Sequence, residues 1–378
     1  MGGGLMQLVA YGAQDIYLSG NPQITFFKVV YRRHTNFSME SIEQTFNGFP
    51  NFGKKVTCPI SRNGDLIHRI YLQATIPAGS TSEWAGHELV KSVEVEIGGQ
   101  RIDKHYAEWL HIWNELTQTA GHWEGYKLMV GGKDNLVSES ASGVAEVNDN
   151  VVFVPLQFWF CRNPGLALPL IALQYHEVKI NLEFGEKEAV GVTGDIASAS
   201  LYVDYIYLDT DERRRFAQVS HEYLIEQLQF TGDETASSKI KLNFNHPCKE
   251  LVWVEKEEGG AVGSYVTSYD TAKLQLNGHE RFSARVPQYF QLVQPYQHHE
   301  RVPVKVEGAD KSTGGINVYS FALKPEEHQP SGTCNMSRID NATLNLTGVD
   351  TSNSVKVFAV NYNVLRVMSG MGGLSFSN

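Results

Sequence analysis

Two stretches of this chain share one pattern, FWFCRNPGLALP at residues 158–169 and YSFALKPEEHQP at residues 319–330. Both carry aromatic side chains at their first and third positions and proline at their seventh and twelfth. The matched pairs are Phe158 and Tyr319, Phe160 and Phe321, Pro164 and Pro325, and Pro169 and Pro330. Each stretch runs into alternating apolar residues, the period of a half-buried β-strand. These residues are Val178, Ile180, Leu182 and Phe184 in the first copy and, with one inserted residue, Ile339, Ala342, Leu344 and Leu346 in the second.

A second pair of landmarks occurs in the same order in each half. Alternating apolar residues lead into a two-residue turn at VEIGG, residues 95–99, and again at LQLNG, residues 274–278. Gly-Gly and Asn-Gly favour a tight hairpin because both central residues of its turn have positive φ. Two landmarks repeated in order predict two copies of one β domain.

The bulk composition is that of a folded globular protein. The chain has 378 residues, of which 42% are apolar and 20% charged, so two domains of ordinary size are expected. The net charge of −10 argues against a protein that coats nucleic acid. The sequence has no run of eighteen apolar residues, so it predicts no membrane span. The four cysteines (Cys58, Cys161, Cys248 and Cys334) are far apart, which indicates isolated, buried thiols in place of zinc ligands or disulfides.

Short strand patterns punctuated by Gly and Pro predict an all-β fold. We expect an N-terminal arm at residues 1–24, a first eight-stranded antiparallel jelly roll at 25–212 and a second at 213–378. One helix interrupts the pattern, because apolar residues from Lys104 to Thr119 follow a 3.6-residue period. The repeat has no counterpart to it, so we interpret it as an insertion in a loop of the first domain only. The charged segment from Asp209 to Arg215 is interpreted as the joint, and the tail from Ser369 as flexible or of positive φ.

Catalytic signatures are missing from the sequence. It has no phosphate-binding Gly-rich loop, no Gly-x-Ser-x-Gly elbow and no His-Glu-x-x-His. Three weaker constellations remain. His298-His299-Glu300 is interpreted as a solvated loop in preference to a metal site, because neighbouring strand residues point to opposite faces. Glu108 and His111 share one face of the single helix, which is too few ligands for a di-iron site. Arg213-Arg214-Arg215 is interpreted as locally neutralised by nearby acidic residues. We therefore expect no enzyme activity, no cofactor and no metal.

Four Asn-x-Ser/Thr triplets are candidate glycosylation sites, at Asn36, Asn335, Asn341 and Asn345. If Ala342, Leu344 and Leu346 face inward, Asn341 and Asn345 lie on the outer face of their strand, where a glycan could reach them.

Several long blocks together resemble the major capsid proteins of nucleocytoplasmic large DNA viruses, most of all the algal, chlorella-virus-like branch. The resemblance covers essentially the whole chain. The blocks are LVAYGAQD (8–15), NPQITFFKVVYR (21–32), ISRNGDL (60–66), IGGQRIDKH (97–105), YHEV (175–178), RFAQ (215–218), HEY (221–223), NHP (245–247) and NYNVL (361–365).

The resemblance implies a structural protein of the virion with two consecutive jelly rolls. Three chains would form a trimer of pseudo-hexagonal outline, and these capsomers would tile an icosahedral shell around an internal membrane and double-stranded DNA. The implied partners are the chain itself, neighbouring capsomers and minor capsid proteins, with Met1–Asn21 as the candidate contact for the last. The protein would be a late product assembled in the host cytoplasm, near the membrane without spanning it and without direct nucleic-acid contact. Relatives carry longer insertions between the counterparts of Val254 and Leu274 and after Asn345, so their glycan positions do not transfer.

Two other classes fit a jelly roll. A carbohydrate-binding module needs an exposed aromatic platform, but Trp84, Trp123 and Trp159 are scattered in the sequence. A cupin-like metalloenzyme needs a His-x-His pair, which the sequence lacks.

Overall fold

The computed structural model describes residues 6–7, 9–10, 12–21, 26, 35–77, 80, 82–131, 150–307 and 310–377. The chain divides into two compact units, Met1–Phe37 and Ser38–Asn378. The first unit contains a short helix, α2 (Asp15–Ser19), whose last turn closes through the Gly20 N–H on the Ile16 carbonyl at 2.9 Å. The predicted arm, residues 1–24, falls in this unit, but its residues 1–5, 8, 11 and 22–24 lie outside the described residues.

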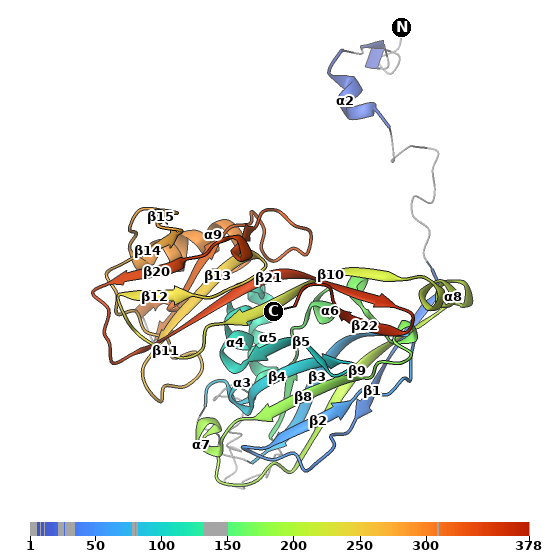
Figure 1. Cartoon of the computed structure of the whole chain (residues 1–378), viewed down its shortest axis with the longest axis horizontal. Helices are drawn as coiled ribbons and strands as arrows, with labels where there is room; N and C mark the ends of the chain where they lie inside the picture. Colours follow the sequence, from blue (N-terminus) through green and yellow to red (C-terminus); the bar gives the residue numbers. More distant parts are fainter. Residues whose placement is uncertain are drawn as a thin grey trace. The chain divides into compact units, whose positions relative to one another are not determined.

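The first half of the second unit is a sandwich of two antiparallel sheets (Figure 1). One sheet has the order β1-β9-β3-β6 and the other β2-β8-β4-β5, with the two-residue strand β7 added beside β3. The bounds are β1 (Phe37–Gln44), β2 (Lys55–Pro59), β3 (Leu66–Ile76), β4 (Val90–Ile97), β5 (Gln100–Tyr106), β6 (Asn150–Pro155), β7 (Leu168–Pro169), β8 (Val178–Phe184) and β9 (Ser198–Leu208).

The second half repeats this order with its own strands. Its sheets run β10-β21-β13-β18 and β12-β20-β14-β15, with short strands β11, β19 and β22 added to the first and a separate hairpin, β16-β17. The bounds are β10 (His221–Phe230), β11 (Glu234–Thr235), β12 (Lys239–Leu242), β13 (Pro247–Lys256), β14 (Thr271–Leu276), β15 (His279–Glu280), β16 (Val304–Glu307), β17 (Asp310–Thr313), β18 (Ile316–Ser320), β19 (Cys334–Asn335), β20 (Ala342–Thr347), β21 (Ser354–Met368) and β22 (Met371–Leu374). Four strands in each of two sheets, twice, confirm the predicted fold class of two consecutive eight-stranded jelly rolls.

The repeated sequence landmarks occupy equivalent places. The turn at Gly98-Gly99 joins β4 to β5 and the turn at Asn277-Gly278 joins β14 to β15, and all four residues have φ between +50° and +84°. The alternating residues of β8 and β20 point into their own cores, as predicted. Ser369 and Gly370 have positive φ, and the tail beyond them pairs with β21 as β22.

The helices differ from the prediction. The expected helix at residues 104–119 begins at Ala107 in the structure, because residues 104–106 pair with β4 as the end of β5. It ends at Thr117 as α4 (Ala107–Thr117), and a second helix, α5 (Ala120–Val130), follows and ends at Gly131 with φ +85°.

The prediction that only the first half carries a helix at this place was wrong. The second half has a π-helical turn (Tyr289–Val293) that continues into α9 (Gln294–His298), after β15, the counterpart of β5. The predicted domain boundary at residue 212 falls in helix α8 (Thr210–Gln218), which connects β9 to β10. In the described part of the chain, no helix is long and apolar enough to cross a bilayer.

Each sandwich has its own apolar core. The first core includes Leu72, Val93, Ile180 and Leu201, and the second includes Trp253, Leu274 and Leu344. Ile225, Leu365 and Val367, from β10 and β21 of the second half, belong to the core of the first. The two halves therefore share buried surface within one unit.

Candidate functional site

The candidate site is the interface between the two sandwiches, which is built around α4. Trp109, Ile112, Trp113 and Leu116 recur at helical spacing, so they line one face of α4. That face packs on the outer side of the second sandwich, against Val252, Val254, Ile316, Val318, Phe358 and Val360. The interface is thus a third apolar core, between the other two.

The sheet beneath α4 is buried on both sides. Along β13, Val252 and Val254 face α4, whereas Leu251 and Trp253 belong to the second core. Continuous apolar runs are typical of strands covered on both faces. The runs LVWV (251–254) and VFAV (357–360) carry this signal in the sequence. These runs predicted strands. That the strands are also covered by a second apolar interface was not predicted.

Aromatic rings continue the contact at one end of the helix. Phe358 stacks on Phe230 with ring centroids 4.8 Å apart and lies 5.6 Å from Trp109. Tyr106, the residue before α4, lies 4.9 Å from Phe230. Such aromatic pairs add attraction to the area that they bury, about 1 kcal/mol each.

A largely buried carboxylate at the start of α4 is held by two lysines of the second sandwich. Glu108 Oε1 lies 2.5 Å from Lys356 Nζ and 3.3 Å from Lys256 Nζ, both on the second sandwich. Burial raises the pKa of Glu108, but the two ammonium groups outweigh burial and hold that pKa below its usual value. Burial lowers the pKa of Lys356, but the negative charge of Glu108 outweighs the effect of burial. The pKa of Lys356 is therefore raised above its usual value. Both groups are therefore charged in the folded protein.

A second charged group joins the halves below the helix. Arg162, at the end of α6 (Trp159–Arg162), contacts Glu226 of β10 at 2.7 Å and lies 4.6 Å above the Trp113 ring. Lys249 of β13 contacts the other oxygen of Glu226, also at 2.7 Å. Burial raises the pKa of Glu226, but Arg162, His328 and Lys249 outweigh it and lower the pKa to about 2.

Backbone groups complete the junction. The Leu228 N–H donates to Asp103 Oδ1 at 2.9 Å, and the Gln227 amide donates to the Ile102 carbonyl, which ties β5 to β10. The Arg301 N–H donates to the Leu116 carbonyl at 3.0 Å, so the second half satisfies a carbonyl in the last turn of α4.

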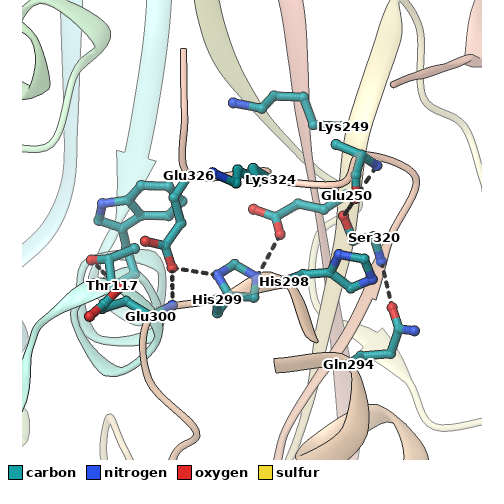
Figure 2. A network of polar contacts seen from close by, with 12 residues as sticks. Thr117, Lys249, Glu250, Gln294, His298, His299, Glu300, Ser320, Lys324 and Glu326 are labelled. Carbon is teal, nitrogen blue, oxygen red and sulfur yellow. Dashed lines mark hydrogen bonds and ion pairs between the residues drawn. The ribbon is translucent and has the colours of Figure 1, made fainter. Parts of the chain in front are cut away.

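The constellation His298-His299-Glu300 is not a solvated loop, and that prediction was wrong for His299. Figure 2 shows the His299 ring between two carboxylates, with Glu250 Oε2 2.9 Å from Nε2 and Glu326 Oε1 2.9 Å from Nδ1. Burial lowers the pKa of His299, but Glu250 and Glu326 outweigh it and raise the pKa to about 9. His299 is thus a buried cation that holds α9 to β13. His298 lies at the edge of the network and contacts the Leu323 carbonyl.

The residues of the other two predicted constellations do not come together in one site. His111 contacts Tyr265 while Glu108 binds lysines, so the two do not converge. The prediction paired the arginines with acidic residues nearby in the sequence. In the structure, Arg213 instead contacts Asp65 at 2.9 Å. Among the described residues, no three His, Cys, Asp or Glu side chains are placed to hold a metal ion.

Two of the three tryptophans converge in space, which their sequence spacing did not predict. The Trp84 and Trp123 ring centroids are 6.4 Å apart. Trp84 and Trp159 are buried, so the three do not form an exposed sugar-binding platform.

The cysteines are free thiols, and three of the four are buried. The prediction that they are isolated does not hold for Cys248 and Cys334, which are direct cross-strand neighbours in β13 and β19.

The candidate glycosylation sites differ in exposure. Asn341, Asn335 and Asn36 are exposed, whereas Asn345 is half-buried and its Nδ2 donates to Gln275 Oε1 at 3.1 Å. Asn335 Oδ1 accepts the Ser337 N–H at 3.1 Å and caps a short helical turn.

Comparisons with known proteins identify the architecture. Residues 25–209 match the family described as major capsid protein N-terminus, and residues 212–373 match the large eukaryotic DNA virus major capsid protein. The chain is 78% identical to the major capsid protein of Pyramimonas orientalis virus and 44% identical to that of Paramecium bursaria Chlorella virus 1, each over the full length of both chains. It also resembles a chain of the solved PBCV-1 virus capsid, with a TM-score of 0.80, 40% identity, and coverage of 94% of this chain and 100% of that one.

These matches confirm the resemblance carried by the sequence blocks. The chain therefore belongs to the major capsid proteins of large eukaryotic DNA viruses, as a structural component of the virion capsid and not an enzyme.

Proposed function

We propose that three copies of this chain form a homotrimer whose six jelly rolls give a capsomer of pseudo-hexagonal outline, and that such capsomers tile an icosahedral shell. The observation that carries this proposal is the repeat of one strand order in both halves of the chain. Two like domains in each of three chains supply six similar units around a ring, and closed rings with one repeated contact are the ordinary form of a homo-oligomer.

Light scattering after size-exclusion chromatography tests the trimer. Three chains of 42.2 kDa would give about 127 kDa, and negative-stain images of that species should have a hexagonal outline. A folded species of 42.2 kDa at every concentration tested, with or without co-expressed viral proteins, would contradict the proposal.

We further propose residues 25–212 and 213–378 as the two jelly-roll domains. The change of sheet membership between β9 and β10 supports the boundary. The residues before them, 1–24, would be an arm that contacts minor capsid proteins through Met1–Asn21. Deleting residues 1–20 should then leave the trimer intact and impair shell assembly; normal shells from the truncated chain would rule the arm contact out.

The remaining proposals follow from the same role. As a capsid subunit made late in infection and assembled in host cytoplasm, the protein would lie close to an inner membrane without crossing it. Asn36, Asn335, Asn341 and Asn345 remain the candidate glycan positions, of which we propose that the three exposed ones carry a glycan and the half-buried Asn345 does not. Intact mass measurement of protein from purified virions tests them directly.

A further inference from the structure

The contact that α4 makes within the chain uses elements that both sandwiches possess. In the first sandwich, α4 lies in the connection from β5 to β6 and covers the outer face of β13, β18 and β21. In the second sandwich, the helical segment 289–298 lies in the equivalent connection, from β15 to β18. The sheet equivalent to the covered one is β3, β6 and β9 of the first sandwich, because both sheets share one strand order.

The outer face of that equivalent sheet carries a cluster of aromatic rings among polar side chains and is only partly covered. Tyr71 of β3 stacks on Tyr202 of β9 with ring centroids 5.3 Å apart, and Phe153 of β6 lies 6.3 Å from Tyr71. All three rings are half-buried, and Val151 beside them is 37% exposed. A groove of about 770 Å³ separates this face from α5. Its lining includes Arg69, Tyr71, Phe153, Asp204, His122 and Met129.

The equivalent helical segment presents an apolar surface to match. Tyr296 of α9 is 80% exposed and Val293, three residues earlier, is 40% exposed. Leu323, whose carbonyl contacts His298 of the same helix, is 72% exposed. We call Val293, Tyr296 and Leu323 the α9 patch. Large exposed apolar side chains gathered in one patch are typical of protein interfaces.

We propose that the α9 patch of one copy docks on the Tyr71–Phe153–Tyr202 face of a neighbouring copy, repeating between chains the contact that α4 makes within the chain. The occupant of this sheet face is thus a second copy of the same protein. The inference rests on the proposed trimer and specifies its interface. Because the two surfaces are different, the contact is head-to-tail and closes when the third copy returns to the first.

The anchoring of α9 on its own sandwich supports this role. The Glu250–His299–Glu326 network holds the helix in place (Figure 2), so the patch is presented by a fixed element. A preorganised surface binds more tightly because less freedom is lost on association.

The test uses one variant of each surface in the full-length chain. Tyr296→Glu places a charge in the α9 patch, and Tyr71→Glu places one on the sheet face, with Tyr202→Glu as a second sheet variant. Each variant alone should raise the concentration for half-assembly about tenfold or more, as expected for a central aromatic at an interface. Tyr175→Glu is the matched control, since Tyr175 is 77% exposed and belongs to neither surface.

Mixing the two variants gives a sharper readout. One intact patch and one intact sheet face then remain in each mixed pair, so Tyr296→Glu and Tyr71→Glu chains together should form a dimer of two 42.2 kDa chains, about 84 kDa, that cannot close. Trimers from folded Tyr296→Glu and Tyr71→Glu or Tyr202→Glu chains at wild-type concentrations would overturn this interface and leave the trimer standing. A wild-type chain that stays monomeric would instead overturn the proposed function. Near-ultraviolet circular dichroism identifies the folded variants.

Discussion

His299 Nε2 lies 2.9 Å from Glu250 Oε2, and neither side chain is accessible to solvent. The ring connects the end of α9 to the central strand β13, while its other nitrogen contacts Glu326. A buried cation between two carboxylates is stable only while it keeps its proton, so this contact depends on pH.

The His299 pKa predicts the alkaline limit of stability. Because folding raises this pKa from about 6.5 to about 9, the contribution is complete below pH 6.5 and is lost as pH rises towards 9. A shift of that size corresponds to about 3 kcal/mol. Urea unfolding at pH 6.5 and pH 9 should show the decrease in wild type and a smaller one in His299→Gln. Equal decreases in both chains would mean that another group titrates.

Glu226 predicts the acid limit. Its pKa falls from 4.5 to about 2 on folding, so its contribution is complete above pH 4.5 and is lost as pH falls through this range. Glu226→Gln leaves Arg162 and Lys249 without their carboxylate, which should cost about 3–5 kcal/mol of unfolding free energy at neutral pH. The control Lys324→Ala removes only the exposed pair with Glu327 and should cost less than about 1 kcal/mol.

Trp109→Ala tests the apolar interface beneath α4. Trp109 is 3% exposed and contacts Phe358 across the two sandwiches. Its truncation should lower the free energy of unfolding by about 3–5 kcal/mol through lost burial and a cavity. Leu128→Ala on the neighbouring helix, where the side chain is 60% exposed, should have little effect. Similar losses from the two variants would contradict the burial of this face.

We expect a glycan on Asn341 and none on Asn345, although both asparagines lie at or beside β20. Asn341 is exposed, whereas Asn345 is half-buried and donates to Gln275. In a host that glycosylates Asn-x-Ser/Thr, Asn341→Gln should remove mass from the protein and Asn345→Gln should not. Intact mass spectrometry measures this, and a loss confined to Asn345→Gln would reverse the order.

The sequence predicted the features that depend on local pattern. The alternation along β8 and β20 and the turns at Gly98-Gly99 and Asn277-Gly278 are set by neighbouring residues, so periodicity and turn chemistry found them. Because these landmarks recur in the same order in each half, they were enough to predict two like domains.

The site depends on contacts between distant residues and was largely missed. His299 looks like a loop residue because its partners, Glu250 and Glu326, are far away in the chain. The helix at 289–298 was overlooked because its apolar residues are divided between its own core and the exposed patch. The α4 interface is indicated in the sequence by the unbroken apolar runs of β13 and β21. A strand with only one buried face would alternate apolar and polar residues, so these runs indicate strands that are covered on both faces.

The sheet buried on both sides also constrains how such a chain could arise. A free single sandwich with Val252, Val254 and Phe358 on its surface would expose an apolar face and associate with its neighbours. An ancestor with one sandwich per chain could carry this face only as an oligomer. Joining two sandwiches in one chain makes this contact intramolecular, so every newly made chain already holds it whatever the protein concentration.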